Sequence, residues 1–245
     1  AQKLSDIREY ANVMQALWRG EVVSTELEGS KHKLKFMHPQ TGFVNTVHDI
    51  PIHFSAFGPK ARKLTANHAD GFINAWMSPN ALDDVNEVKS HRLSSGKLEP
   101  LYSTCLNLGC ILEDGEAYDS PRARAQAGPW PAIAWHWMVE DGDKANIPPE
   151  LLPLIEQYRE IYLSYEPEDA RYMTLHSGHL MYLRPEEQQF VTGEMLKALT
   201  LTGRPSEIKA RCSQLRAAGY EQIAIQIVPG HEAEIDQWAK VLMDC

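Results

Sequence analysis

The sequence predicts an α/β fold with a parallel sheet, and its last quarter shows the repeating unit most clearly. Pro205 stands where the first turn of a helix tolerates a missing N–H, and Gly219 follows the last apolar position of that helix. Residues 223–228 are then apolar except for Gln226, which is typical of a parallel strand covered on both faces. The same helix–strand unit occurs twice more upstream with no hairpin signal between the strands, which favours parallel pairing.

The first regular element is an amphipathic helix that ends at Gly20. Such a helix must have its apolar stripe covered, either by later helices and strands or by a segment that precedes residue 1. Residues 20–49 have mixed polarity and predict loops and short strands. The stripe consists of Leu4, Ile7, Ala11, Met14, Leu17 and Trp18.

Four segments are predicted to be strands of the sheet, with helices between them. The first is rich in β-forming residues and ends at the turn signal Gly58–Pro59. The third is the longest, a largely apolar run that carries small polar groups. The predicted strands are residues 51–57, 71–76, 100–112 and 222–228, and short helices are expected at 60–68 and 81–93.

Residues 116–201 interrupt this rhythm with a long, largely helical insertion, and residues 172–183 within it are rich in aromatic side chains and histidine. An insertion of this length is typical of a lid or an oligomer contact. Three tryptophans flank His136, and their helical spacing predicts burial against the rest of the fold or a partner subunit. They are Trp130, Trp135 and Trp137.

Length and composition restrict the class of protein. A chain of 245 residues is expected to form a single domain, residues 1–245, and its net charge of −9 argues against a nucleic-acid partner. No apolar run approaches the roughly 18 residues that span a bilayer, and no signal peptide opens the chain. Four cysteines predict buried thiols in a reducing, cytoplasmic compartment. They are Cys105, Cys110, Cys212 and Cys245.

Three motifs carry a resemblance to a known family. Residues 10–20 (Tyr-Ala-Asn-Val-Met-Gln-Ala-Leu-Trp-Arg-Gly) are similar to a helix that ends in Leu-Trp-x-Gly. Residues 51–71 resemble a fifth strand, a Gly-Pro loop, a helix and an Ala-Asp-Gly start of a sixth strand, and residues 202–226 resemble a closing Thr-Gly-x-Pro-x-Glu helix with a final strand. In this order the motifs resemble the luciferase-like monooxygenases, which are flavin- or deazaflavin-dependent oxidoreductases built on a TIM barrel.

The resemblance implies that the chain holds strands five to eight of a (β/α)8 barrel, its C-terminal half. It implies FMN, or alternatively a deazaflavin, as cofactor, a small organic molecule as substrate, and flavin or a flavin reductase as partner. An open half-barrel leaves strand edges and apolar surface uncovered, which predicts association into homo-oligomers.

The candidate cofactor site lies where the predicted strands end. The Gly58–Pro59 turn opens a helix, so its backbone N–H groups suit a flavin phosphate, although they equally suit an ordinary turn. Trp76 ends the next strand and is also compatible with simple packing, and Gln226 needs a polar partner if it is buried. The candidate cofactor-binding residues are Ala56, Phe57, Gly58, Pro59, Lys60, Asn74, Ala75, Trp76 and Gln226.

His176 and His179 are the candidate catalytic residues, because imidazole titrates near neutral pH and can give a proton or a hydrogen bond to a substrate. They are equally compatible with a structural or surface role. Gly178 disfavours a rigid helix, and no further ligand stands at zinc-motif spacing, so no metal site is expected.

Three functions remain open from the sequence. The first is a flavin-dependent monooxygenase or oxidoreductase. The second is a deazaflavin-dependent reductase, in which Lys60, Arg62 and Lys63 pair with the acidic tail of the cofactor or simply form a solvated helix face. The third is a half-barrel that acts only with a complementing partner, and absorbance in the flavin band would separate it from the first.

Overall fold

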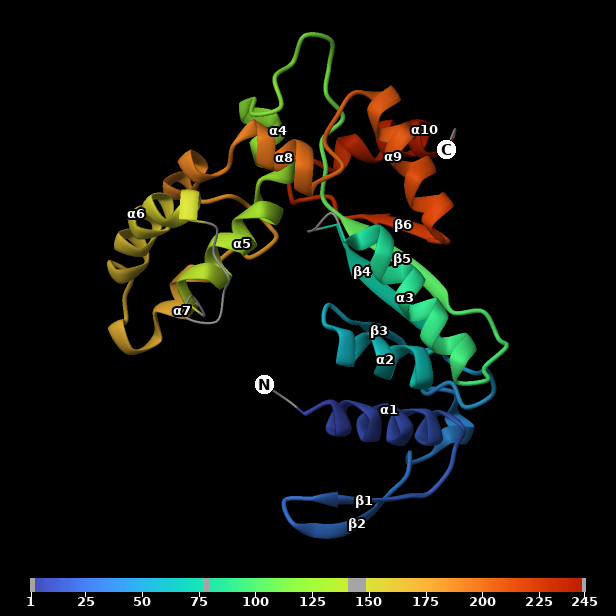
Figure 1. Cartoon of the computed structure of the whole chain (residues 1–245). Helices are drawn as coiled ribbons and strands as arrows, with labels where there is room; N and C mark the ends of the chain where they lie inside the picture. Colours follow the sequence, from blue (N-terminus) through green and yellow to red (C-terminus); the bar gives the residue numbers. More distant parts are fainter. Residues whose placement is uncertain (1–2, 77–79, 141–148, 244–245) are drawn as a thin grey trace. The chain divides into compact units, whose positions relative to one another are not determined.

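The computed structural model describes residues 3–76, 80–140 and 149–243, which form an α/β protein (Figure 1). The chain divides into two compact units. The first unit comprises Ala1–Asn74 and Asp83–Thr104, and the second unit comprises Ala75–Leu82 and Cys105–Cys245.

A four-stranded sheet has the strand order β3-β4-β5-β6. Its first pair is parallel, with His53 opposite Gly71 and Ser55 opposite Ile73. Helices alternate with the strands along the chain, and all four strands lie within the ranges that the sequence predicted. The strands are β3 (His53–Ser55), β4 (Gly71–Ala75), β5 (Tyr102–Asn107) and β6 (Gln222–Ile225), and the helices are α2 (Pro59–His68), α3 (Ala81–Ser94) and α9 (Pro205–Ala218).

Strand β5 is shorter than expected, because the chain leaves the sheet after Asn107. The next residues exchange backbone hydrogen bonds with a second segment: Leu201 N–H donates to the Leu108 carbonyl at 3.0 Å, and Gly203 N–H donates to the Cys110 carbonyl at 3.1 Å. The first part of the apolar run at 100–112 therefore pairs within the sheet and the last part pairs with residues 201–203. Hydrophobicity alone does not distinguish these two pairings.

The first unit begins with α1 (Leu4–Trp18) and a hairpin of β1 (Val23–Leu27) and β2 (Ser30–Leu34). Both turn residues, Glu28 and Gly29, have positive φ, as the tight turns of hairpins require. Helix α1 contacts α2 and β1. Ala11 is buried, but the side chain of Tyr10 is 63% exposed, so the first unit covers only part of this helix.

The second unit is mainly helical, and its largest aromatic cluster lies between α5 and α6. Trp135, Tyr158 and Phe190 pack there with Ile155 and Leu175. The remaining elements are α4 (Pro121–Ala127), α5 (Pro129–Glu140), α6 (Leu152–Leu163), α7 (Arg171–Leu175), α8 (Gly193–Leu199) and α10 (Ile235–Met243), with short 3-10 helices at Pro39–Thr41, Pro149–Leu151, Glu168–Ala170, Pro185–Phe190 and Glu232–Glu234.

The tryptophans around His136 do not share one environment. Trp130 and Trp135 are buried, as the sequence predicted, whereas Trp137 is 50% exposed. Helix α5 turns two of these rings toward the core and the third toward the surface, because consecutive positions of a helix point about 100° apart.

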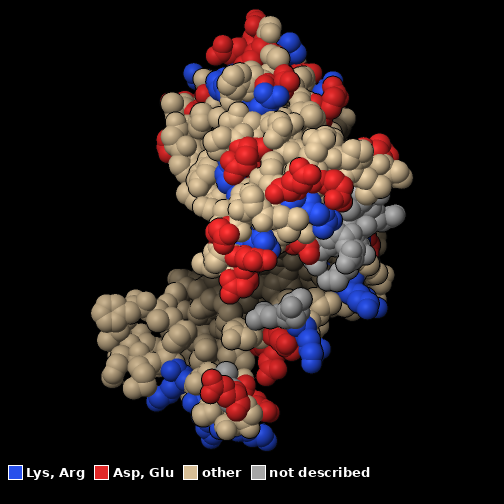
Figure 2. All heavy atoms as spheres, turned by 90° about the vertical axis from the view of Figure 1, so that its left-hand side faces the viewer, with Lys and Arg blue, Asp and Glu red and all other residues tan. Residues whose placement is uncertain are grey.

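The described cysteines are buried, as the sequence predicted, and charged side chains of both signs are mixed on one face of the molecule (Figure 2). Cys105, Cys110 and Cys212 are buried, and Cys245 lies outside the described residues. Burial raises the pKa of the Cys105 and Cys110 thiols to about 12, so they are unreactive at neutral pH. On the face in Figure 2, the described Lys and Arg side chains lie among Asp and Glu and form no continuous basic patch. The helices in the described ranges are too short or too polar to cross a bilayer.

Candidate functional site

The predicted phosphate-binding turn lies in the first unit, at the start of α2. Gly58 is the N-cap residue, with φ −104° and no side-chain cap, and Pro59 follows it. The first N–H groups of the helix therefore lack a capping side chain and remain available to an anion. Ala56 is buried, Phe57 is 62% exposed, and Lys60 is exposed beside the turn.

Arg62 ties this turn to the neighbouring helix. Its guanidinium donates to the Phe57 carbonyl at 2.6 Å and pairs with Asp84 at 3.0 Å and Glu87 at 2.8 Å. Asp84 in turn accepts a hydrogen bond of 3.4 Å from the buried Asn74 amide. Arg62 is therefore already neutralised by two carboxylates and positions the turn.

Trp76, in the second unit, is anchored at both its indole and its backbone. The indole N–H donates to the Ala198 carbonyl at 2.8 Å, and the backbone carbonyl of Trp76 accepts a hydrogen bond of 3.3 Å from the Trp130 indole. The guanidinium of Arg211 lies 5.9 Å from its ring centroid. These contacts give Trp76 a structural role at the end of β4.

Gln226 has the polar partner that its place in an apolar segment requires. Its side-chain amide donates to the Leu180 carbonyl at 2.7 Å, and its backbone N–H donates to the Asn107 carbonyl at 2.9 Å. Leu180 belongs to the segment that follows α7 and carries both candidate histidines. Gln226 thus links this histidine segment, residues 176–182, to the end of β6.

The histidine segment packs where three strands end. Leu180 contacts an apolar cluster of Ala75 at the end of β4, Leu108 just after β5, Val228 just after β6, and Trp130 of α5. The carboxyl ends of parallel strands are the edge at which α/β barrels place their chemistry. The two candidate histidines therefore lie in a segment anchored at this edge of the second unit.

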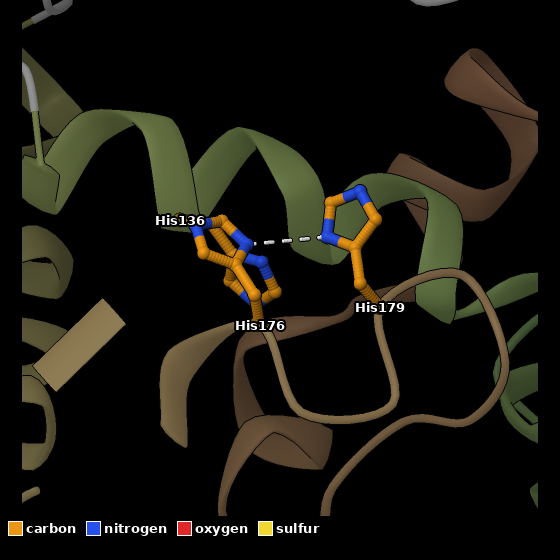
Figure 3. A group of neighbouring side chains, drawn as sticks. All are labelled: His136, His176 and His179. Carbon is orange, nitrogen blue, oxygen red and sulfur yellow. Dashed lines mark hydrogen bonds between the residues drawn. The ribbon is translucent and has the colours of Figure 1, made fainter. Parts of the chain in front are cut away.

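A third histidine joins them (Figure 3). His176 Nδ1 lies 3.3 Å from His179 Nδ1, and the ring of His136 on α5 is centred 5.4 Å from the His176 ring and 5.8 Å from the His179 ring. Burial and then the two neighbouring histidines lower the pKa of His179, so its imidazole is neutral at pH 7. His179 therefore offers a neutral imidazole close to the other two rings.

Two of the three rings form a hydrogen bond to a carboxylate through Nε2. His136 Nε2 lies 2.7 Å from Glu187 Oε1, and His176 Nε2 lies 2.9 Å from Glu140 Oε2. Glu187 also accepts hydrogen bonds from the Tyr158 hydroxyl at 2.6 Å and the Arg184 guanidinium at 2.7 Å. Burial alone would raise the pKa of Glu187, but these hydrogen bonds outweigh it and lower the pKa to about 2.

His136, Glu140 and Glu187 were not identified from the sequence as site residues. Their spacing in the chain follows no motif, since α5 and the histidine segment are brought together only by the folding of the insertion. One local signal existed, because His136 is a polar residue among the apolar side chains of α5 and must find polar partners when buried.

Solved structures similar to this chain share its fold. An F420-dependent secondary alcohol dehydrogenase in complex with an F420-acetone adduct matches with a TM-score of 0.57 and 16% identity, over 97% of this chain and 60% of its own. The coenzyme F420-dependent tetrahydromethanopterin reductase of Methanopyrus kandleri matches with a TM-score of 0.59 and 17% identity, over 98% and 63%. The chain thus spans less than two thirds of the length of these relatives.

The sequence comparisons identify the family. No curated protein matched the chain. The family model described as luciferase-like monooxygenase matches residues 1–222, which is most of the sequence. The chain therefore belongs to the luciferase-like monooxygenase family.

Proposed function

We propose that the chain is the C-terminal part of an oxidoreductase that uses a flavin-type cofactor to act on a small organic substrate. The observation that carries this proposal is the histidine segment, which the apolar cluster around Leu180 anchors at the carboxyl ends of β4, β5 and β6. Family membership supports the same chemistry, in which the cofactor exchanges hydride or activates oxygen and the protein orients the reactants.

His179 is the residue that we assign to the substrate. Its Nδ1 faces His176, and within the described residues its Nε2 has no hydrogen-bond partner, so that nitrogen is available to a substrate oxygen. His176, held through its own Nε2 by Glu140, positions His179. Because its pKa is lowered, His179 is more suited to hydrogen bonding as a neutral imidazole than to carrying a permanent positive charge.

The cofactor phosphate is assigned to the start of α2. The uncapped first turn presents backbone N–H groups, and the exposed Lys60 and Lys63 add positive charge nearby. Asn74 of the first unit, and Ala75, Trp76 and Gln226 of the second, remain candidates from the sequence alone for contact with a cofactor.

A deazaflavin is our first candidate for the cofactor, because both relatives described above are F420-dependent enzymes. FMN is the second candidate and is favoured by the description of the family as monooxygenases, since a reduced flavin activates oxygen and a deazaflavin reacts with it poorly. An FMN enzyme would also need a flavin reductase as partner.

Isothermal titration of the chain with F420 and with FMN tests the proposal. We expect binding of one cofactor, with F420 the tighter, and weaker binding by Gly58→Val at a cost of about 1–3 kcal/mol, because a branched side chain blocks close approach to the backbone. A Cβ at Gly58 meets no atom within 4 Å, so the variant should fold normally. Ser94→Val, an exposed substitution in the same unit, is the control and should bind like wild type.

The other outcomes are equally informative. Equal affinity of wild type and Gly58→Val would place the phosphate elsewhere. Tighter binding of FMN would reverse the cofactor assignment. If neither cofactor binds, the isolated chain lacks a functional site, and the half-barrel that requires a complementing partner becomes the better description.

A further inference from the structure

Three histidines of the second unit have the arrangement of a metal site. His136, His176 and His179 each offer one ring nitrogen, and these three nitrogens lie within 4.8 Å of one another. Figure 3 shows the rings gathered between α5 and the histidine segment. Imidazole nitrogen is a preferred ligand of zinc, copper, nickel and iron.

His136 has a ring nitrogen with a free lone pair. An ionised carboxylate only accepts hydrogen bonds, so the contact with Glu187 places the ring proton of His136 on Nε2. The lone pair is then on Nδ1, which is buried and has no hydrogen-bond partner in the described structure. A buried nitrogen without a partner is costly, and a cation at this position would satisfy it.

His176 presents its lone pair in the same way. Its Nε2 donates to Glu140, which leaves Nδ1 unprotonated and 3.3 Å from His179 Nδ1. A tetrahedral zinc ion with Zn–N bonds of about 2.0–2.1 Å holds its ligand nitrogens about 3.3 Å apart. These two nitrogens are therefore already at ligand spacing.

The two carboxylates complete the pattern. A metal-bound histidine almost always donates its other ring N–H to a carboxylate or carbonyl, which fixes the tautomer and the ring orientation. Glu187 does this for His136 and Glu140 does it for His176. Two of the three rings thus have their outer hydrogen bonds in place before any ion binds.

We propose that His136, His176 and His179 bind one divalent transition-metal ion, with zinc as the reference ion, through their Nδ1 atoms. Three protein nitrogens leave a fourth position for water or a substrate oxygen. The bound ion joins the histidine segment to α5. When Nδ1 of His179 binds the ion, the proton of this ring lies on Nε2, which stays available to a substrate oxygen, so the inference goes beyond the proposed role of this residue without replacing it.

Metal titration of the untagged chain tests the inference. After removal of metal with EDTA, we expect one Zn²⁺ per chain, with a Kd of about 1 μM or tighter in competition with a chromophoric chelator. Co²⁺ should give the visible absorption bands of a tetrahedral site. Failure to bind either ion would overturn the proposal and leave a hydrogen-bonded histidine cluster.

Three variants locate the site. His179→Ala should weaken Zn²⁺ binding by at least about 100-fold, and Glu140→Gln, which touches no ion, should weaken it by about 10–100-fold. His32→Ala, an exposed histidine of the hairpin, is the matched control and should bind like wild type. Circular dichroism would confirm that each variant is folded.

Two results would refute this assignment. Retention of wild-type affinity by His179→Ala would place any bound ion elsewhere, and equal losses in His179→Ala and His32→Ala would indicate non-specific binding. Cofactor titration is independent of these measurements, so failure of the metal site and failure of the proposed function are distinguishable.

Discussion

At the residue scale, single charged side chains hold together segments that are distant in sequence. Arg122 of α4 donates to the Ile111 carbonyl at 2.8 Å, pairs with Glu116 and lies 3.5 Å from Glu234. Glu116 also accepts a hydrogen bond of 2.6 Å from the Ser120 hydroxyl and one of 2.9 Å from the Glu113 N–H. The loop before α4 is therefore organised around one arginine and one carboxylate.

Glu116 should make stability depend on pH. Its hydrogen bonds, chiefly from Arg122, lower its pKa from the ordinary 4.5 to about 2 in the folded chain. Because the folded-state pKa is depressed, the stabilisation is complete above pH 4.5 and is lost as pH falls toward 2. Glu116→Gln should lower the free energy of unfolding by about 1–3 kcal/mol at pH 6, and this difference should vanish near pH 2.

Urea unfolding at a series of pH values measures this effect. Asp119→Asn is the control, because Asp119 is 49% exposed and makes one longer contact to Arg124, so its loss should cost less than about 1 kcal/mol. A difference between wild type and Glu116→Gln that did not change with pH would refute the explanation.

At the element scale, helix ends depend on glycine for two different reasons. Gly219 ends α9 in the left-handed conformation, with φ 109°, and its N–H donates to the Leu215 and Arg216 carbonyls. Gly58 begins α2 with φ −104°, a conformation that any residue adopts. Only the first of these positions requires glycine for backbone geometry.

Alanine substitutions should separate the two roles. Gly219→Ala should lower the free energy of unfolding by about 1–2 kcal/mol, because an L side chain is strained in the left-handed region. Gly58→Ala, the matched control, should cost less in the absence of cofactor, because φ −104° is open to any residue. Both are measured by urea unfolding, and equal effects would contradict the assignment.

At the scale of the whole molecule, the first unit leaves an apolar helix face only partly covered. Tyr10 and Met14 of α1 are 63% and 39% exposed and line a groove of about 670 Å³ beside the hairpin, which also includes Val13 and Leu34. Apolar surface of this kind is a common site of association.

We therefore expect the chain to self-associate at micromolar concentration. Analytical ultracentrifugation should show this association, and the double substitution Tyr10→Glu and Met14→Lys should weaken it by placing charges in the groove. Leu98→Ser removes an exposed side chain that does not line the groove and should leave association unchanged. If the wild type is a compact monomer at these concentrations, the exposed apolar face of α1 does not drive association.

The local sequence determined the order and the approximate bounds of the regular elements. Pro205 and Gly219 marked the ends of α9, and Gly58–Pro59 marked the junction of β3 and α2, because the backbone conformations of proline and glycine are local properties. Each family motif likewise lies within one continuous segment, and the family model matches residues 1–222.

Only the tertiary structure decided the composition of the histidine site and the length of β5. His176 and His179 were identified from the chemistry of imidazole within one short segment, but His136 lies 40 positions before His176 and reaches them through the packing of α5. Likewise, the apolar residues after Asn107 suit a strand, yet they leave β6 and pair with residues 201–203. Hydrophobicity determines that a segment is buried, whereas its partners depend on contacts between segments far apart in the chain.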